Sequence, residues 1–265
     1  MSVHGGNIEE VARMYKFNPE EIVDFSANIN PMGLSENVKK AMINSIDKVI
    51  KYPDITYFDL KNSISNFEDI NSQNIILGNG AAEAIFNIVR ALKPKKALLP
   101  APTFSEYEEA ILSVNGEIKY YKLKEKNNFE IDNEFIDNIN VVFICNPNNP
   151  TGVLTTNQFI IKVLKKALIT NTIIVIDESF LDFMETNNEY SSKGLLNYYD
   201  NLIVVKSLTK FFAIPGARIG YGLCKNNVLI NEINKVTVPW SINIIAADAI
   251  IQGLKEKDYI NNSIK

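Results

Sequence analysis

The sequence predicts an α/β fold with a mostly parallel sheet, on two observations. Short β-rich runs alternate with helical patterns, and several of these runs are apolar on both faces, as in strands that helices cover on both sides. The alternation is typical of parallel sheets between helices. The expected strands are residues 74–77, 96–100, 117–123, 141–145, 172–177, 202–206 and 219–224. The helix-like stretches are residues 81–92, 104–116, 156–168 and 241–256.

The ends of two of these helices carry recognisable signals. Gly116 is expected to be the C′ glycine that ends the helix over 104–116, and Thr156 is expected to be the N-cap of the next helix.

The first ~70 residues contain helical patterns at about 7–16, 36–47 and 57–67 and no strong strand. We expect an arm or capping segment laid over the main sheet. The predicted division is an arm with substrate contacts over 1–35, a large domain over 36–256, and the start of a further region over 257–265.

The composition excludes several classes of protein. The chain has 265 residues, 46% of them hydrophobic, and a net charge of −4 without a basic block, which argues against nucleic-acid binding. No apolar run approaches the ~20 residues of a membrane span. The first ten residues have no apolar core of a signal peptide. Cys145 and Cys224 lie in separate strand-like runs, so we expect buried reduced thiols in a cytoplasmic protein rather than a disulfide.

Three of the predicted strands are followed by loops that are rich in residues suited to binding or catalysis. These loops lie at the carboxyl ends of the strands, where open α/β sheets bind ligands. "GNGAAE" (78–83) is a glycine turn that opens a helix, which suits either a phosphate or a tight connection. "NPNNPTG" (146–152) predicts a rigid turn bearing amides. In "IDESF" (176–180), Asp177 leaves a buried strand, either as a helix cap or ion pair, or as a functional acid.

A fourth loop, "SLTKFFAIPGARIGY" (207–221), adds a lysine with hydroxyl neighbours. Lys210 alone reads as a surface lysine, but the four loops together supply what pyridoxal phosphate requires. The lysine amine binds it covalently, and an acid pairs with its ring nitrogen. Hydroxyls, backbone N–H groups and an arginine hold its phosphate.

These motifs resemble those of the fold-type-I pyridoxal-phosphate enzymes, aminotransferase class I and II, from about residue 20 onward. The resemblance implies an aspartate-aminotransferase-like large domain, with Lys210 and Asp177 as catalytic residues. It also implies a homodimer in which Tyr52 reaches the neighbouring subunit's cofactor. The implied cofactor-binding residues are Gly80, Ala81, Ala82, Phe104, Asn149, Asp177, Ser207, Thr209, Lys210, Arg218 and Tyr52.

Two branches of that family fit best. "HGGN" (4–7), "DFSANINPMG" (24–33) and "VPWSIN" (238–243) resemble the threonine-phosphate decarboxylases of cobalamin biosynthesis. The phosphorylated amino-acid substrate would then be bound by His4, Gly5, Gly6, Asn28 and Asn149. Phe180 stands where aminotransferases of this group generally have a tyrosine that donates to the ring 3-oxygen, and phenylalanine cannot donate.

Two alternatives stay open, a histidinol-phosphate aminotransferase and a non-catalytic cofactor-binding or dimerising remnant. Members of the family continue into a small C-terminal domain whose arginines bind substrate anions. Since the sequence stops at Lys265, we expect that domain to be missing, as in a fragment or a truncated and inactive product.

Overall fold

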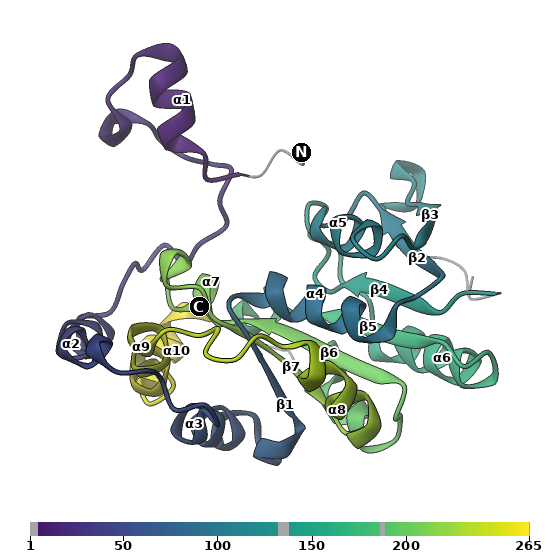
Figure 1. Cartoon of the computed structure of the whole chain (residues 1–265). Helices are drawn as coiled ribbons and strands as arrows, with labels where there is room; N and C mark the ends of the chain where they lie inside the picture. Colours follow the sequence, from purple (N-terminus) through teal and green to yellow (C-terminus); the bar gives the residue numbers. More distant parts are fainter. Residues whose placement is uncertain (1–4, 132–137, 186–188, 265) are drawn as a thin grey trace.

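A seven-stranded mixed sheet forms the centre of the computed structural model, which describes residues 5–131, 138–185 and 189–264 (Figure 1). The strand order is β1-β7-β6-β5-β4-β2-β3. Strand β7 runs antiparallel to β1 and β6, and the remaining pairs are parallel. The mostly parallel sheet and all seven predicted strands are therefore confirmed. The strands are β1 (Ile75–Gly78), β2 (Lys96–Ala101), β3 (Glu117–Lys122), β4 (Val141–Cys145), β5 (Ile173–Asp177), β6 (Leu202–Ser207) and β7 (Gly220–Cys224).

Helices cover both faces of this sheet, and each face has its own apolar core. Helices α4 (Ala81–Leu92), α5 (Glu106–Leu112) and α8 (Asn227–Val236) pack on one face. Ile85, Ile88 and Val89 form the buried stripe of α4, at the spacing of one helix face. The other core includes side chains from α2 (Glu36–Asn44), α3 (Phe58–Glu68), α6 (Asn157–Ile169), α9 (Ile244–Gly253) and α10 (Lys257–Ser263).

One predicted helix end is confirmed and the other is wrong. The Thr156 side chain accepts a hydrogen bond from the Phe159 N–H at 3.4 Å, so Thr156 caps α6. Helix α5 ends at Leu112, and Asn115, with φ of 59°, takes the left-handed conformation expected for Gly116. Gly116 is needed for space instead, because a Cβ there would lie 2.7 Å from the Ile111 side chain.

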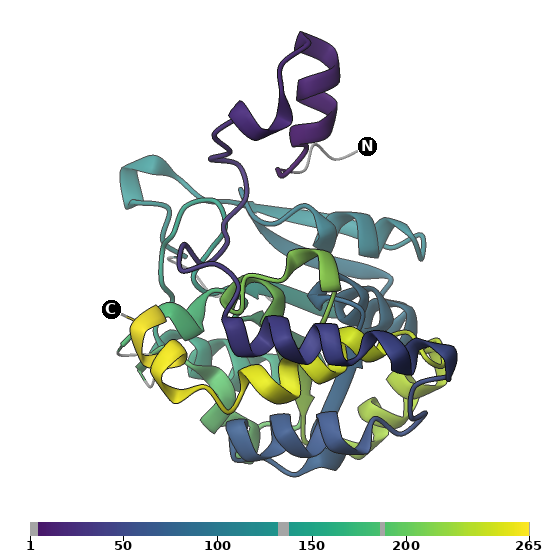
Figure 2. The same ribbon diagram turned by 90° about the vertical axis from the view of Figure 1, so that its left-hand side faces the viewer.

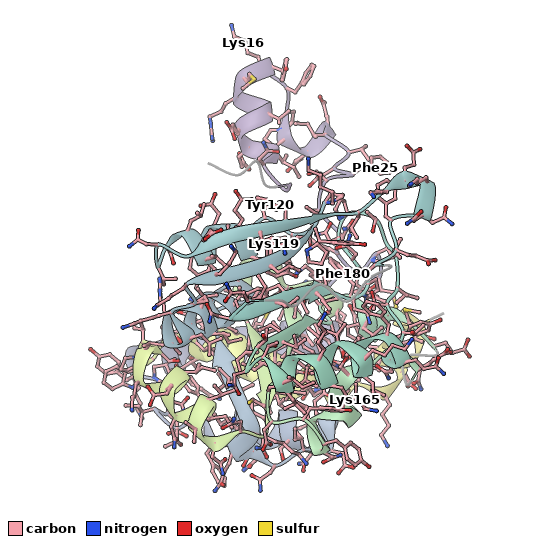
Figure 3. The ribbon with its side chains drawn as sticks, turned by 90° about the vertical axis from the view of Figure 1, so that its right-hand side faces the viewer. Lys16, Phe25, Lys119, Tyr120, Lys165 and Phe180 are labelled. Atoms are coloured by element: carbon pink, nitrogen blue, oxygen red, sulfur yellow. The ribbon has the colours of Figure 1, made fainter. Side chains whose placement is uncertain are left out.

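The first helix stands apart from the body of the protein (Figures 1 and 2). Helix α1 (Ile8–Tyr15) buries only Ala12, and its Met14 and Tyr15 side chains are more than half exposed, so its apolar side chains do not pack on the core. Phe25, on the extended segment that follows, is 92% exposed (Figure 3). Helices α2 and α3 pack against α9. The sequence predicts an arm or capping segment laid over the main sheet; α1 is an arm of this kind but does not lie on the sheet.

The described ranges contain no helix of the length and apolarity that crossing a bilayer requires.

Candidate active site

A cavity of about 310 Å³ lies at the carboxyl ends of β4, β5 and β6, beside the first turn of α4. Parallel strands end at the same edge of a sheet, which is why loops far apart in sequence meet here. Eleven of the predicted site residues line it: Gly5, Asn28, Ala81, Ala82, Phe104, Asn149, Asp177, Ser207, Thr209, Lys210 and Arg218.

The other predicted site residues lie elsewhere. Tyr52 lines a separate surface groove, and its ring packs at a tilt against Trp240, with 4.9 Å between ring centroids. Gly6 and Gly80 do not line the cavity. His4 falls outside the described residues.

Lys210 lies in the short helix α7 (Leu208–Phe211), directly after β6. Its Nζ is 3.4 Å from Ser207 Oγ and 5.1 Å from the centroid of the Phe180 ring. Burial lowers the pKa of the Lys210 amine, and Arg218 lowers it further, while Asp177 and the Cys145 thiol act in the opposite direction. A lowered pKa increases the fraction of neutral amine, which is the nucleophilic form.

Asp177 ends β5 and is 3% exposed. Its carboxylate accepts hydrogen bonds from the Tyr107 hydroxyl at 2.7 Å and from the Ser179 N–H at 2.9 Å. Tyr107 is fully buried and stacks on Phe143, with 4.9 Å between ring centroids. Burial raises the pKa of the neighbouring Cys145 thiol to about 12, so that thiol stays protonated. The carboxylate is thus held in one orientation at the floor of the cavity.

The sequence reading missed Tyr107. Tyr107 lies in the first turn of α5, and Phe104 lies just before that helix. The two rings meet edge-on, with 5.6 Å between their centroids.

The opposite part of the cavity suits an anion. The first N–H groups of a helix have no partners within the helix, and those of Ala81 and Ala82 open α4 here. The hydroxyls of Ser207 and Thr209 lie 3.2 Å apart. The Arg218 guanidinium lies against Gly80, where an added Cβ would be 2.3 Å from Arg218 Nη2. The missing side chain of Gly80 therefore leaves space for the Arg218 guanidinium beside the N-terminus of α4.

The segment before α2 closes one side of the cavity. Asn30 is buried, and its side chain donates to the Phe211 carbonyl at 2.8 Å. Its N–H donates to the Lys210 carbonyl at 3.1 Å. Asn28 lines the cavity, while Asn30 fastens the segment to α7. The sequence reading singled out Asn28 but not Asn30.

The family model for aminotransferase class I and II matches residues 20–265. The chain belongs to this family. It is 34% identical to the threonine-phosphate decarboxylase of Salmonella typhimurium, over 93% of this chain and 68% of that protein.

Two solved structures of this family are also similar. The histidinol-phosphate aminotransferase from Clostridium acetobutylicum is 35% identical, with a TM-score of 0.84 over 92% of this chain and 72% of that one. The L-threonine-O-3-phosphate decarboxylase from Porphyromonas gingivalis is 26% identical, with a TM-score of 0.80 over 90% of this chain and 71% of that one. The expected aminotransferase-like α/β fold is confirmed.

The cavity fits the cofactor that the sequence predicted. It places a nucleophilic amine, a buried carboxylate and an anion site around one space, with the Phe104 ring in its wall. These are the groups that pyridoxal phosphate needs for its aldehyde, its ring nitrogen and its phosphate.

Proposed function

We propose that this chain carries the pyridoxal-phosphate site of a decarboxylase that acts on L-threonine O-3-phosphate and releases aminopropanol phosphate. The observation that carries the proposal is that residues of the N-terminal arm line the cavity. Gly5 and Asn28, from the two motifs that resemble the decarboxylases, line the cavity that contains Lys210 and Phe180. The Gly6 N–H donates to Ser26 Oγ at 2.8 Å and joins these two motifs.

Each side chain has a role in this proposal. Lys210 would bind the cofactor covalently and move protons at its Nζ. Asp177 would hold the proton of the ring nitrogen, and Asn149 would donate a hydrogen bond to the ring hydroxyl. The N–H groups of Ala81 and Ala82, the hydroxyls of Ser207 and Thr209, and the Arg218 guanidinium would hold the phosphate. When bound, pyridoxal phosphate draws electrons from a bond at the α-carbon of an amino acid into its ring.

The choice of bond depends on how the protein orients the substrate. Hydrogen bonds from the arm to the substrate phosphate would fix the orientation of the substrate, and this orientation would decide whether the carboxylate is the group that is lost. An aminotransferase presents the Cα–H bond instead. Phe180 offers no donor to the ring 3-oxygen, which agrees with the decarboxylase branch.

The product formed from L-threonine O-3-phosphate tests the proposal. We expect carbon dioxide and aminopropanol phosphate from the purified protein saturated with cofactor. Asn28→Ala should raise KM about tenfold, because a hydrogen bond to a charged group is lost. Amino transfer from glutamate to imidazole-acetol phosphate without carbon dioxide would instead favour the histidinol-phosphate aminotransferase, which the Clostridium acetobutylicum structure supports. If the protein binds the cofactor but catalyses neither reaction, the result would favour the third alternative, a non-catalytic cofactor-binding remnant.

We also propose that two copies of the chain pair through the surface around Tyr52. Tyr52 is 80% exposed beside a groove of about 330 Å³. Ile46, Val49 and Ile50 are also more than half exposed on the same connection between α2 and α3. Exposed apolar groups gathered in this way mark interaction sites.

A charge placed on this surface tests the pairing. Ile50→Lys should convert the dimer into a monomer in sedimentation velocity. Ile169→Lys is the matched control, because Ile169 at the end of α6 has the same exposure of 84%. A wild-type monomer, or equal behaviour of the two variants, would contradict the proposal.

A further inference from the structure

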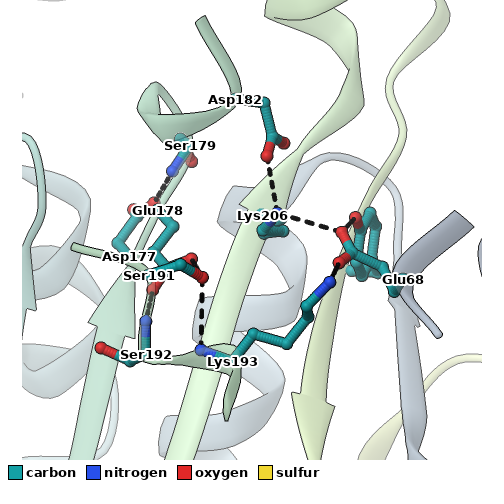
Figure 4. A network of polar contacts seen from close by, with 10 residues as sticks. Glu68, Asp177, Glu178, Ser179, Asp182, Ser191, Ser192, Lys193 and Lys206 are labelled. Atoms are coloured by element: carbon teal, nitrogen blue, oxygen red, sulfur yellow. Dashed lines mark hydrogen bonds and ion pairs between the residues drawn. The ribbon is translucent and has the colours of Figure 1, made fainter. Parts of the chain in front are cut away.

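A buried cluster of charged side chains surrounds Lys206 in β6 (Figure 4). At its centre the Lys206 ammonium donates to Asp182 Oδ1 at 2.6 Å and lies 3.0 Å from Glu68 Oε1. The Lys206 side chain is 5% exposed. Lys206 directly precedes Ser207 in β6, so its side chain points to the opposite face of the sheet. Lys206 therefore has no place in the lining of the cavity.

Lys206 and Glu68 are charged at neutral pH. Burial opposes the charge on Lys206, but Asp182, Glu68 and Glu178 outweigh it and raise the lysine pKa. Burial likewise opposes the charge on Glu68, but Lys206 and Lys193 outweigh it and lower the pKa of that carboxyl to about 2. Lys206 and Glu68 thus each have a partner of opposite charge, as buried ions require. Glu178 instead accepts hydrogen bonds from Ser191 and Ser192, and burial raises its pKa to about 7.

Asp182 connects this cluster to the active site. It lies in the 3-10 helix η5 (Leu181–Phe183), which begins directly after Phe180. The Phe180 ring faces the Lys210 amine, 5.1 Å from ring centroid to Nζ. A second contact joins the same turn to α7, because Phe183 and Phe211 have ring centroids 5.1 Å apart.

We propose that Lys206 is a positioning residue of the active site, which through Asp182 holds the Phe180 ring against the Lys210 amine. The charged groups that shift the pKa of that amine are Asp177 and Arg218, neither of which belongs to the cluster, so the cluster acts through the position of the ring. The inference rests on Lys210 as the reactive amine and holds for decarboxylation and transamination alike.

The test measures how fast Lys210 of the cofactor-free protein is trapped by pyridoxal 5′-phosphate and borohydride, as a function of pH. An aromatic face favours the protonated amine, so its removal lowers the midpoint of this profile. Asp182→Ala should lower the midpoint by about half a pH unit, a threefold change in the ratio of protonated to neutral amine. Asp182→Asn keeps an acceptor for Lys206 without the charge and should stay near the wild-type midpoint.

Two controls separate positioning from other effects. Lys193→Met removes the other ion pair of Glu68, 3.0 Å long, without touching Asp182. It should lower thermal stability and leave the midpoint unchanged. In a Phe180→Leu background, Asp182→Ala should cause no further shift, because interacting sites are not additive.

Three results would overturn the proposal: an unchanged midpoint in folded Asp182→Ala, equal shifts in Asp182→Ala and Asp182→Asn, or a full shift in the Phe180→Leu background. Lys206→Met should shift the midpoint as Asp182→Ala does, and Lys206→Arg should restore it. If Lys206→Met fails to fold, the comparison of Asp182→Ala with Asp182→Asn still tests the proposal. Trapping at a lysine other than Lys210 in the wild type would also reject the proposal, whichever reaction the protein catalyses.

Discussion

Lys210→Ala is expected to abolish covalent attachment of pyridoxal phosphate and to lower turnover by at least about 10³. The Lys210 amine, the proposed nucleophile, lines the cavity, and burial lowers its pKa. Alanine removes both the covalent anchor and the group that moves the proton. Borohydride reduction of the cofactor-loaded protein, followed by intact mass measurement, should show one added cofactor in the wild type and none in the variant.

Lys206 is a matched internal control for this experiment. It lies four residues earlier and is more deeply buried, but its ion pairs raise its pKa and keep the amine protonated. Fragmentation of the labelled peptide should therefore place the label on Lys210 and not on Lys206. A label on any other lysine, or none in protein saturated with cofactor, would reject the assignment.

The position of the cavity could be predicted because it depends on local patterns. Runs that are apolar on both faces identify strands of a covered sheet, and parallel strands end at one edge. The loops with Asn149, Asp177 and Lys210 follow such runs, so their meeting follows from the topology alone.

The supporting contacts could not be predicted in the same way. Tyr107 reaches Asp177 across 70 residues of sequence, and Asn30 reaches the Phe211 carbonyl across 181. No local periodicity encodes such pairs, because they depend on how helices and loops pack on the finished sheet. Lys206 also interrupts an apolar strand, and only the fold supplies the carboxylates of Glu68 and Asp182 that make its burial possible.

Asp177→Asn is expected to lower turnover by about 10²–10³ while the cofactor stays attached to Lys210. The buried carboxylate supplies a fixed negative charge at the floor of the cavity, and asparagine supplies none. The amide fills nearly the same space and can still accept from the Tyr107 hydroxyl, so the fold should be kept. Steady-state kinetics and borohydride trapping, measured on the same sample, would separate lost chemistry from lost cofactor.

Tyr107→Phe is the graded control for Asp177. It leaves the charge in place and removes one hydrogen bond of 2.7 Å to the carboxylate. The expected loss of turnover is about tenfold, the size of one hydrogen bond to a charged group. Asp177→Asn must therefore be the more damaging change if the carboxylate acts through its charge. Equal losses in the two variants would mean that Asp177 matters only for its orientation, and turnover near the wild-type value in Asp177→Asn would remove it from the catalytic residues.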